Sequence, residues 1–170
     1  MRNSRRIIFA FILATSGFAA QAQLAKNPER EEQTFFSADD QSVERPVAIP
    51  DNVLGILKRT EKISSDEQSS DSLLASQIRL GGGGESGLLV IGVGLRDAHY
   101  APFWLFRKTT RGYDLVLAFR GDGLEVLNEK TNTHRDIAAY RFAEANGSTT
   151  IYRFDGIKYR RFRTVRSRSR

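Results

Sequence analysis

The sequence predicts an α+β fold that is mostly β, an antiparallel meander sheet of about six to eight strands with one short helix before it. Three observations lead to this prediction. Short apolar segments alternate with glycine-containing turns from residue 73 onward, an Asp-Gly hairpin signal lies near the end, and only one earlier segment has helical spacing.

The first 22 residues have the three-part layout of a secretory signal peptide. Three arginines precede the apolar stretch 7–14, and the small-residue triplet AQA predicts cleavage after Ala22. The stretch is shorter than the roughly 20 residues that span a bilayer, and no later stretch is long enough. We therefore expect a periplasmic or secreted protein without a transmembrane segment after cleavage, although an uncleaved signal anchor stays open.

The composition limits the chemistry of the chain. It contains no cysteine, which excludes disulfides, thiol catalysis and cysteine-ligated metal, so a packed core must stabilise the fold. Seven basic residues and no acid follow from Lys158 onward, whereas residues 23–157 carry 16 basic and 20 acidic residues. The basicity therefore belongs to the end of the chain, and it disfavours nucleic acid as a ligand of the domain.

The residues after the signal predict a leader and then one domain. Residues 23–48 are polar and aperiodic, which indicates a flexible leader with Phe35 and Phe36 as a docking point. Residues 49–163 predict a single β-rich domain, which begins with a short helix capped by Asp51 or Asn52. A polar linker, 64–72, follows the helix.

The strands are predicted from short apolar segments. The stretch 87–95 is continuously apolar, as in a strand covered on both faces, and 102–108 and 113–119 form a hairpin. Alternation in the second strand of that hairpin places its large residues on one core-facing side. The segment 135–145 favours a strand, with a helix left open. The large residues of 113–119 are Tyr113, Leu115, Leu117 and Phe119.

The segment IYRFDGIKYRRF, 151–162, predicts the last hairpin. A two-residue type I′ turn at Asp155-Gly156 would place Phe154 opposite Ile157 and Tyr152 opposite Tyr159. One face is then aromatic and the other cationic, as an edge hairpin requires. Residues 164–170 follow as a basic tail. The candidate anion-binding residues are Arg161, Arg163, Arg166, Arg168 and Arg170.

Few residues suggest catalysis. Asp97, His99 and Tyr100 form the weak catalytic candidates, because an aspartate can orient an imidazole, yet no nucleophile accompanies them. His99 and His134 are both interpreted as turn or surface residues, and Asp136 follows His134 by two positions. The glycine runs lack phosphate-loop signatures and are interpreted as turns. We predict no cofactor and no metal.

Three stretches carry a resemblance. APFWLFRKTTRGYDLVL, THRDI and TTIYRFDGIKYRRF together resemble a family of short exported bacterial proteins of uncharacterised function, over roughly residues 74–162. YRFDGIKY is also similar to hairpins in some propeller-like repeat proteins, but no repeat period recurs here. The resemblance implies a single β-rich domain and carries no activity onto any residue.

These observations predict a non-enzymatic, monomeric binding or accessory domain of the cell envelope. Its partner is expected to be an anionic envelope component or another envelope protein, bound through the basic end. A small periplasmic hydrolase with a loop site around Asp97 and His99 is the alternative. A secreted enzyme inhibitor is the second alternative.

Overall fold

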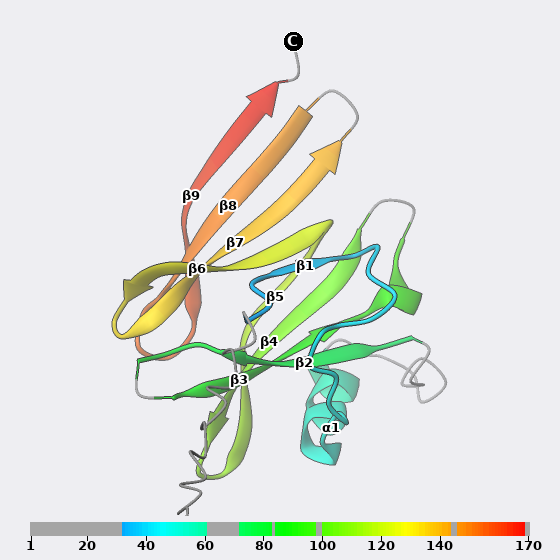
Figure 1. The fold of residues 1–170 in the computed structure, drawn as a ribbon, viewed down its shortest axis with the longest axis vertical. Coiled ribbons are helices and arrows are strands. Elements are labelled where there is room, and N and C mark those ends of the chain that lie inside the picture. Colours follow the sequence, from blue (N-terminus) through cyan, green and yellow to red (C-terminus); the bar gives the residue numbers. More distant parts are fainter. Residues whose placement is uncertain (1–31, 61–71, 83, 98–99, 144–145, 169–170) are drawn as a thin grey trace, which may run out of the picture. The chain divides into compact units, whose positions relative to one another are not determined.

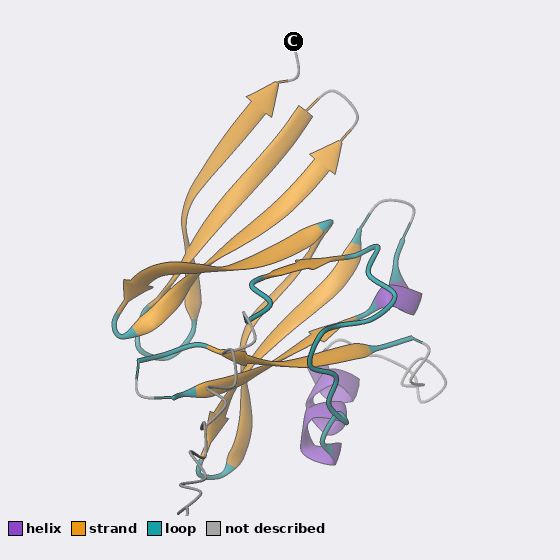
Figure 2. Ribbon diagram, in the orientation of Figure 1, coloured by secondary structure: helices purple, strands orange, loops and turns teal. Residues whose placement is uncertain are grey.

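The computed structural model describes residues 32–60, 72–82, 84–97, 100–143 and 146–168. The predicted signal peptide and nearly all of the predicted linker lie outside these residues. The described part contains nine strands, one α-helix and a 3-10 turn (Figures 1 and 2). These elements are β1 (Phe35–Ser37), α1 (Asp51–Thr60), β2 (Leu74–Arg79), β3 (Ser86–Ile91), η2 (Val93–Leu95), β4 (Ala101–Thr109), β5 (Gly112–Gly121), β6 (Gly123–Thr131), β7 (His134–Ala143), β8 (Asn146–Phe154) and β9 (Tyr159–Arg168).

The strands form two antiparallel sheets. One has the order β2-β3-β4-β5, and the other has the order β1-β6-β7-β8-β9. The mostly β fold with one short helix is confirmed, but the predicted single meander is wrong. The segment 135–143 is a strand, as favoured from the sequence. Within each sheet, consecutive strands from β2 onward pair as hairpins, so the meander is correct only locally.

The chain changes sheets at Gly121-Asp122-Gly123. The Asp122 N–H donates to the Tyr140 carbonyl at 2.9 Å, and the Asp122 carbonyl accepts the Ala38 N–H at 2.8 Å. A β-carbon on Gly121 would lie 2.5 Å from the Tyr140 carbonyl oxygen, so only glycine permits this approach. β6 therefore pairs with β1 and β7 instead of folding back on β5.

Two apolar clusters hold the elements together. The inter-sheet core contains residues of both sheets, such as Leu89 and Phe103 from one and Ile137 and Phe154 from the other. The helix-side cluster packs α1 against the opposite face of the four-stranded sheet, around Trp104. β3 is buried on both faces, as predicted for the apolar stretch 87–95, but the strand ends at Ile91 and Val93–Leu95 form η2 instead. The helix-side cluster comprises Val53, Leu57, Leu73, Ala75, Leu88, Val90, Trp104 and Phe106.

A β-bulge divides the predicted core face of β5. Leu105 is paired with Leu117 and Phe106 with Leu115, so Val116 is an extra residue on β5. An extra residue inverts the alternation of side chains along a strand. Tyr113 and Leu115 therefore pack on the helix-side cluster, whereas Leu117 and Phe119 pack on the inter-sheet core. The prediction that these four residues share one face is wrong.

The domain extends beyond its predicted boundaries at both ends. Within the predicted leader, β1 pairs with β6 and buries Phe36 completely, while Phe35 stays half-exposed on the other face of β1. Only Phe35 thus remains accessible of the predicted docking pair. At the C-terminal end, β9 continues to Arg168, so residues 164–168 of the predicted tail are a strand. The helix begins at Asp51, and Pro50 accepts its first N–H bonds.

The last hairpin has a different register from the predicted one. Phe154 pairs with Tyr159, and Tyr152 pairs with Arg161, so the loop has four residues instead of two. The Asp155 carboxylate explains the longer loop, since it accepts the N–H groups of Ile157 and Lys158, each at 2.8 Å. It also accepts the Arg160 Nε–H at 2.7 Å. Tyr152, Phe154 and Tyr159 nevertheless keep their predicted core-facing side.

We expect the Asp155 loop to make stability depend on pH. The Lys158 N–H, then Arg160 and the Ile157 N–H, lower the pKa of Asp155 below its usual range. A carboxyl whose pKa is lower in the folded state stabilises the fold above its unfolded pKa of about 4, and this contribution is lost as pH falls. Asp155→Asn should therefore lower the urea midpoint at neutral pH, and the gap to the unchanged chain should shrink below about pH 4.

Asp155→Ser is the matched control for this prediction. A serine hydroxyl can still accept a loop N–H but does not titrate. The urea midpoints of Asp155→Ser and Asp155→Asn should therefore converge on that of the unchanged chain over the same acidic range. A gap that stays constant between neutral and acidic pH would contradict the assignment.

Candidate functional site

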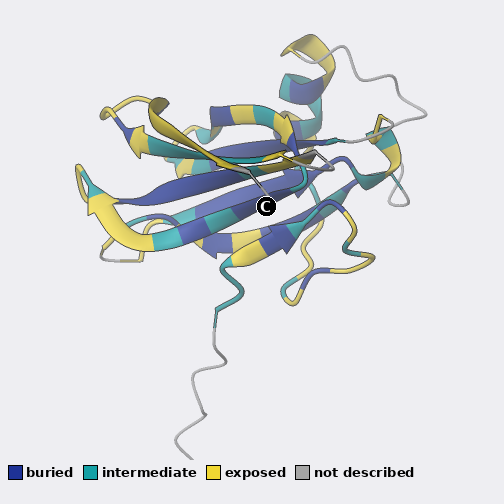
Figure 3. Ribbon diagram, turned by 90° about the horizontal axis from the view of Figure 1, so that it is seen from above, coloured by how far each residue is buried: buried dark blue, intermediate teal, exposed yellow. Residues whose placement is uncertain are grey.

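The candidate site is the outer edge of β9, the last strand of the five-stranded sheet. Residues 160–167 are all exposed, whereas the strands around the inter-sheet core are largely buried (Figure 3). The distal halves of β7, β8 and β9 extend beyond the four-stranded sheet (Figure 1). Residues 141–142 of β7 are exposed, and residues 146–150 of β8 are exposed or half-buried. In the part of the chain that the structure describes, no strand pairs with the outer side of β9.

Three of the predicted anion-binding residues have unpaired side chains on this edge. Arg161, Arg163 and Arg166 are exposed, and no hydrogen bond or ion pair to another described residue holds their guanidinium groups. Unpaired, exposed guanidinium groups are able to bind carboxylate or phosphate in a bidentate manner. Arg168 ends β9, although its side chain is not described, and Arg170 lies outside the described residues. The anion-binding role of these two residues stays a prediction.

The register places the three arginines on both faces of the strand. Arg161 lies opposite Tyr152 and Arg166 opposite Ser148, which share one face of β8 by alternation. Arg163 lies opposite Ile151, on the other face. A bulge between these pairs leaves Phe162 as the extra residue. The cations therefore flank the free edge of β9 from both sides.

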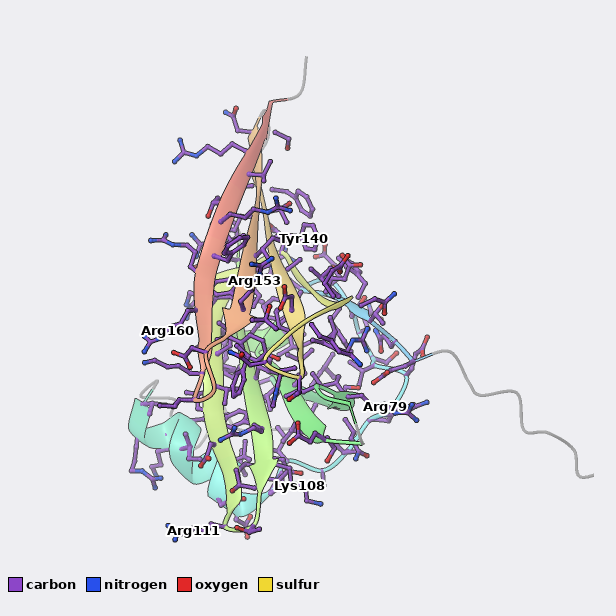
Figure 4. All side chains as sticks on the ribbon, turned by 90° about the vertical axis from the view of Figure 1, so that its left-hand side faces the viewer. Arg79, Lys108, Arg111, Tyr140, Arg153 and Arg160 are labelled. Carbon is purple, nitrogen blue, oxygen red and sulfur yellow. The ribbon has the colours of Figure 1, made fainter. Side chains whose placement is uncertain are left out.

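The neighbouring arginines already have partners. The Arg160 Nε lies 2.7 Å from the Asp155 carboxylate, and the Arg153 Nε lies 3.2 Å from the carboxylate of the buried Asp136. The Arg153 guanidinium also stacks on the Phe162 ring, 3.5 Å from its centroid. Figure 4 looks onto β9, with both of these arginines labelled beside it. They fix the base of the hairpin and are not counted among the free cations.

An aromatic row covers the outer face of the same sheet. Phe35 packs edge-on against Tyr140, with ring centroids 5.7 Å apart, and Tyr140 stacks on Phe142 at 5.9 Å. The Tyr140 hydroxyl donates to Glu125, and burial together with that hydrogen bond and charge raises the pKa of Tyr140 to about 12. Phe142 is 59 % exposed. This row lies on the same face of the sheet as Arg163, but β8 separates it from β9.

The two described residues of the predicted catalytic loop, Asp97 and Tyr100, make contacts that hold the loop in shape. The Asp97 carboxylate accepts the Tyr100 N–H at 2.8 Å and lies 3.2 Å from the Arg120 guanidinium. The Arg141 guanidinium lies over the Tyr100 ring, 5.5 Å from its centroid. Both Asp97 and Tyr100 are thus engaged in shaping a turn. His99 lies outside the described residues, so the hydrolase hypothesis, which depends on this imidazole, stays a prediction.

Three consecutive residues at the start of β7 form a buried polar row that the sequence did not indicate. His134, Arg135 and Asp136 are buried, so the interpretation of His134 as a turn or surface residue is wrong. The His134 ring stacks on Phe154 at 4.0 Å, and its Nε2 lies 3.4 Å from the Glu85 carboxylate. Backbone bonds from Gly82 and Arg135 join this end of β7 to the end of β2. These contacts therefore connect the five-stranded sheet to the four-stranded sheet.

A shallow cleft of about 500 Å³ lies between the β1 loop and η2, where its carboxylates are engaged in local contacts. Asp39 pairs with Arg96, and Asp40 accepts the Ser37 N–H at 2.8 Å. In the described residues, no group of three or more histidine or acidic side chains could hold a metal ion. No helix there is long and apolar enough to cross a membrane.

Comparison with known proteins gave no match to a family model, to a curated protein or to a solved structure. The resemblance to short exported bacterial proteins therefore stays a prediction. The case for a binding site depends on the arginines of β9 and their surroundings alone.

Proposed function

We propose that the chain is an exported, non-enzymatic binding or accessory domain of the cell envelope, which holds an anionic component on the edge of β9. The observation that carries this proposal is the set of three exposed, unpaired arginines on a strand that no described element covers. A strand holds the cations at fixed spacing, which lowers the entropy lost on binding relative to a disordered basic tail.

The local excess of positive charge supports the same function. No acidic residue follows Asp155 in the sequence, and Asp155 itself is bonded to Arg160. Like charges close together on a strand repel one another, so an anionic ligand would relieve this repulsion. Arginine, with its planar guanidinium, suits carboxylate and phosphate groups equally well. Export follows from the predicted signal peptide and remains part of the proposal.

Neutralising the three arginines tests the proposed function. We expect Arg161→Gln, Arg163→Gln and Arg166→Gln combined to weaken binding about tenfold or more, since each cation near an anionic surface contributes up to about 1 kcal/mol. The probes are polyphosphate, vesicles of phosphatidylglycerol and phosphatidylcholine in equal parts, and a peptide of the repeat Glu-Glu-Val. The purified chain should bind at least one probe, and more tightly at about 0.01 M than at about 0.15 M salt.

A matched control removes three other exposed cations. Arg79, Lys108 and Arg111 lie on β2, on β4 and in the β4–β5 turn, away from β9 (Figure 4). Their combined replacement by glutamine gives the same net charge and should leave binding within about twofold of the unchanged chain. Binding to none of the three probes, or equal loss in both triple variants, would refute the proposed function.

A further inference from the structure

We propose that the free edge of β9 binds an extended acidic polypeptide segment, which adds to the five-stranded sheet as a sixth strand. This inference rests on the proposed function and specifies the chemical class of its partner. Strand addition to an exposed sheet edge is a general mode of peptide recognition, in which main-chain hydrogen bonds supply affinity and alternate side chains supply specificity.

The backbone of β9 is suited to strand addition. β9 has ten residues and ends the sheet, and no described strand lies on its outer side. In an antiparallel pair, the N–H and C=O groups of successive residues point alternately toward the partner and away from it. Every second residue along the regular part of β9 therefore directs both groups outward, where they form a row that a new strand would bond.

The positions of the cations favour a polypeptide over a flat anionic surface. Arg161 and Arg166 lie on one face of β9 and Arg163 on the other. A strand paired with β9 projects its side chains alternately to both faces, with opposed side chains about 4.5 to 5.5 Å apart. Acidic side chains of such a strand would meet the cations of both faces at once. A membrane surface laid against one face would not reach the cations of the other.

The side chains between the arginines extend this preference. Phe162 and Val165 are 52 % and 54 % exposed, so apolar residues in the added segment would cover them. A segment that carries acidic residues on both of its faces, with apolar residues between them, fits this edge. A second copy of β9 does not fit, because pairing two such strands would bring arginines next to arginines. The charges thus select an acidic partner and disfavour self-association through β9.

Two proline variants separate strand addition from simple charge attraction. Thr164 and Val165 are adjacent, uncharged and in regular register with Thr150 and Thr149, so one of their two N–H groups faces β8 and the other faces outward. Proline is tolerated on an edge strand only where the missing N–H faced solvent. Of Thr164→Pro and Val165→Pro, the variant that keeps the melting temperature of the unchanged chain is therefore the one that lacks the outward N–H.

The measurement is fluorescence anisotropy with a labelled peptide of the repeat Glu-Glu-Val, which places glutamate and valine on both faces of an extended strand. We expect the stable proline variant to bind this peptide about tenfold more weakly while it retains every arginine, a loss equal to about 1.4 kcal/mol. A peptide of the repeat Lys-Lys-Val should not bind the unchanged chain. Hydrogen exchange provides a second readout on the unchanged chain, where the peptide should slow exchange at outward-facing amides of β9.

The outcomes distinguish this inference from the proposed function. If polyphosphate or vesicles bind and the acidic peptide does not, strand addition is wrong and the proposed function stands. If the peptide binds with no change in amide exchange along β9, or equally well to both proline variants, strand addition is likewise refuted. If none of the probes binds, the proposed function itself fails. Should both proline variants unfold, the exchange measurement on the unchanged chain decides.

Discussion

Replacing Trp104 by alanine is expected to lower the free energy of unfolding by about 3 to 5 kcal/mol. Trp104 lies on β4, is 2 % exposed and is the largest side chain of the helix-side cluster. It packs among residues of α1 and β3, including Leu57 and Val90. Its removal would leave a cavity between the helix and the sheet, and urea denaturation followed by circular dichroism measures the loss.

Two further variants control this experiment. Trp104→Phe keeps most of the aromatic volume and should cost clearly less than Trp104→Ala. Phe142→Ala removes an exposed aromatic ring from the outer face of β7 and should change stability by no more than about 0.5 kcal/mol. A Trp104→Ala variant as stable as Phe142→Ala would show that α1 does not depend on this contact.

Arg135→Met is expected to destabilise the fold by a similar amount, about 3 to 5 kcal/mol. The buried Arg135 guanidinium donates to the carbonyls of Leu127 and Val126, at 2.6 Å and 2.8 Å, and to Asn128. It also lies 3.3 Å from the Glu32 carboxylate. Methionine would fill the volume but leave one buried and one part-buried carbonyl without this donor, and one carboxylate without its counter-charge.

The pairing of Arg135 with Glu32 can be measured separately by a double-mutant cycle. Glu32 accepts the Arg79 N–H at 2.7 Å as well, so it connects β2 to β7. Arg135→Met should cost less in a Glu32→Gln background, because the unpaired carboxylate is then absent. Arg135→Lys should restore only part of the stability, since a single ammonium cannot replace a planar group with several donors. Strict additivity in the cycle would contradict the pairing.

The sequence predicted local structure well because local rules determine it. The strand β3 has apolar residues at successive positions, and the structure buries it on both faces. The sheet switch at Gly121 was not predictable, because a glycine-rich turn within a meander and one between sheets have the same local sequence. The hairpin register was missed because the Asp155 side chain bonds the loop, and its geometry depends on Arg160 across the hairpin.

The positive charge of the candidate site was predicted, but the extension of its strand to Arg168 was not. The arginines after Lys158 are evident from the sequence, yet Arg166 lies in a polar stretch that lacks the apolar alternation of a half-buried strand. Pairing with β8 makes it a strand all the same. The buried row of His134, Arg135 and Asp136 was missed because polar residues give no burial signal, and their partners come from distant segments.

The pairing of β1 with β6 also affects the order in which the fold can be completed. Strands β2 to β5 lie between β1 and β6 along the chain, so the β1–β6 ladder closes a long loop that contains the whole four-stranded sheet. Long loops close later than local hairpins, because more chain entropy must be lost. We therefore expect Phe36 to complete its packing in the inter-sheet core only once β6 has formed. Until then, the growing chain exposes the inner face of its first sheet.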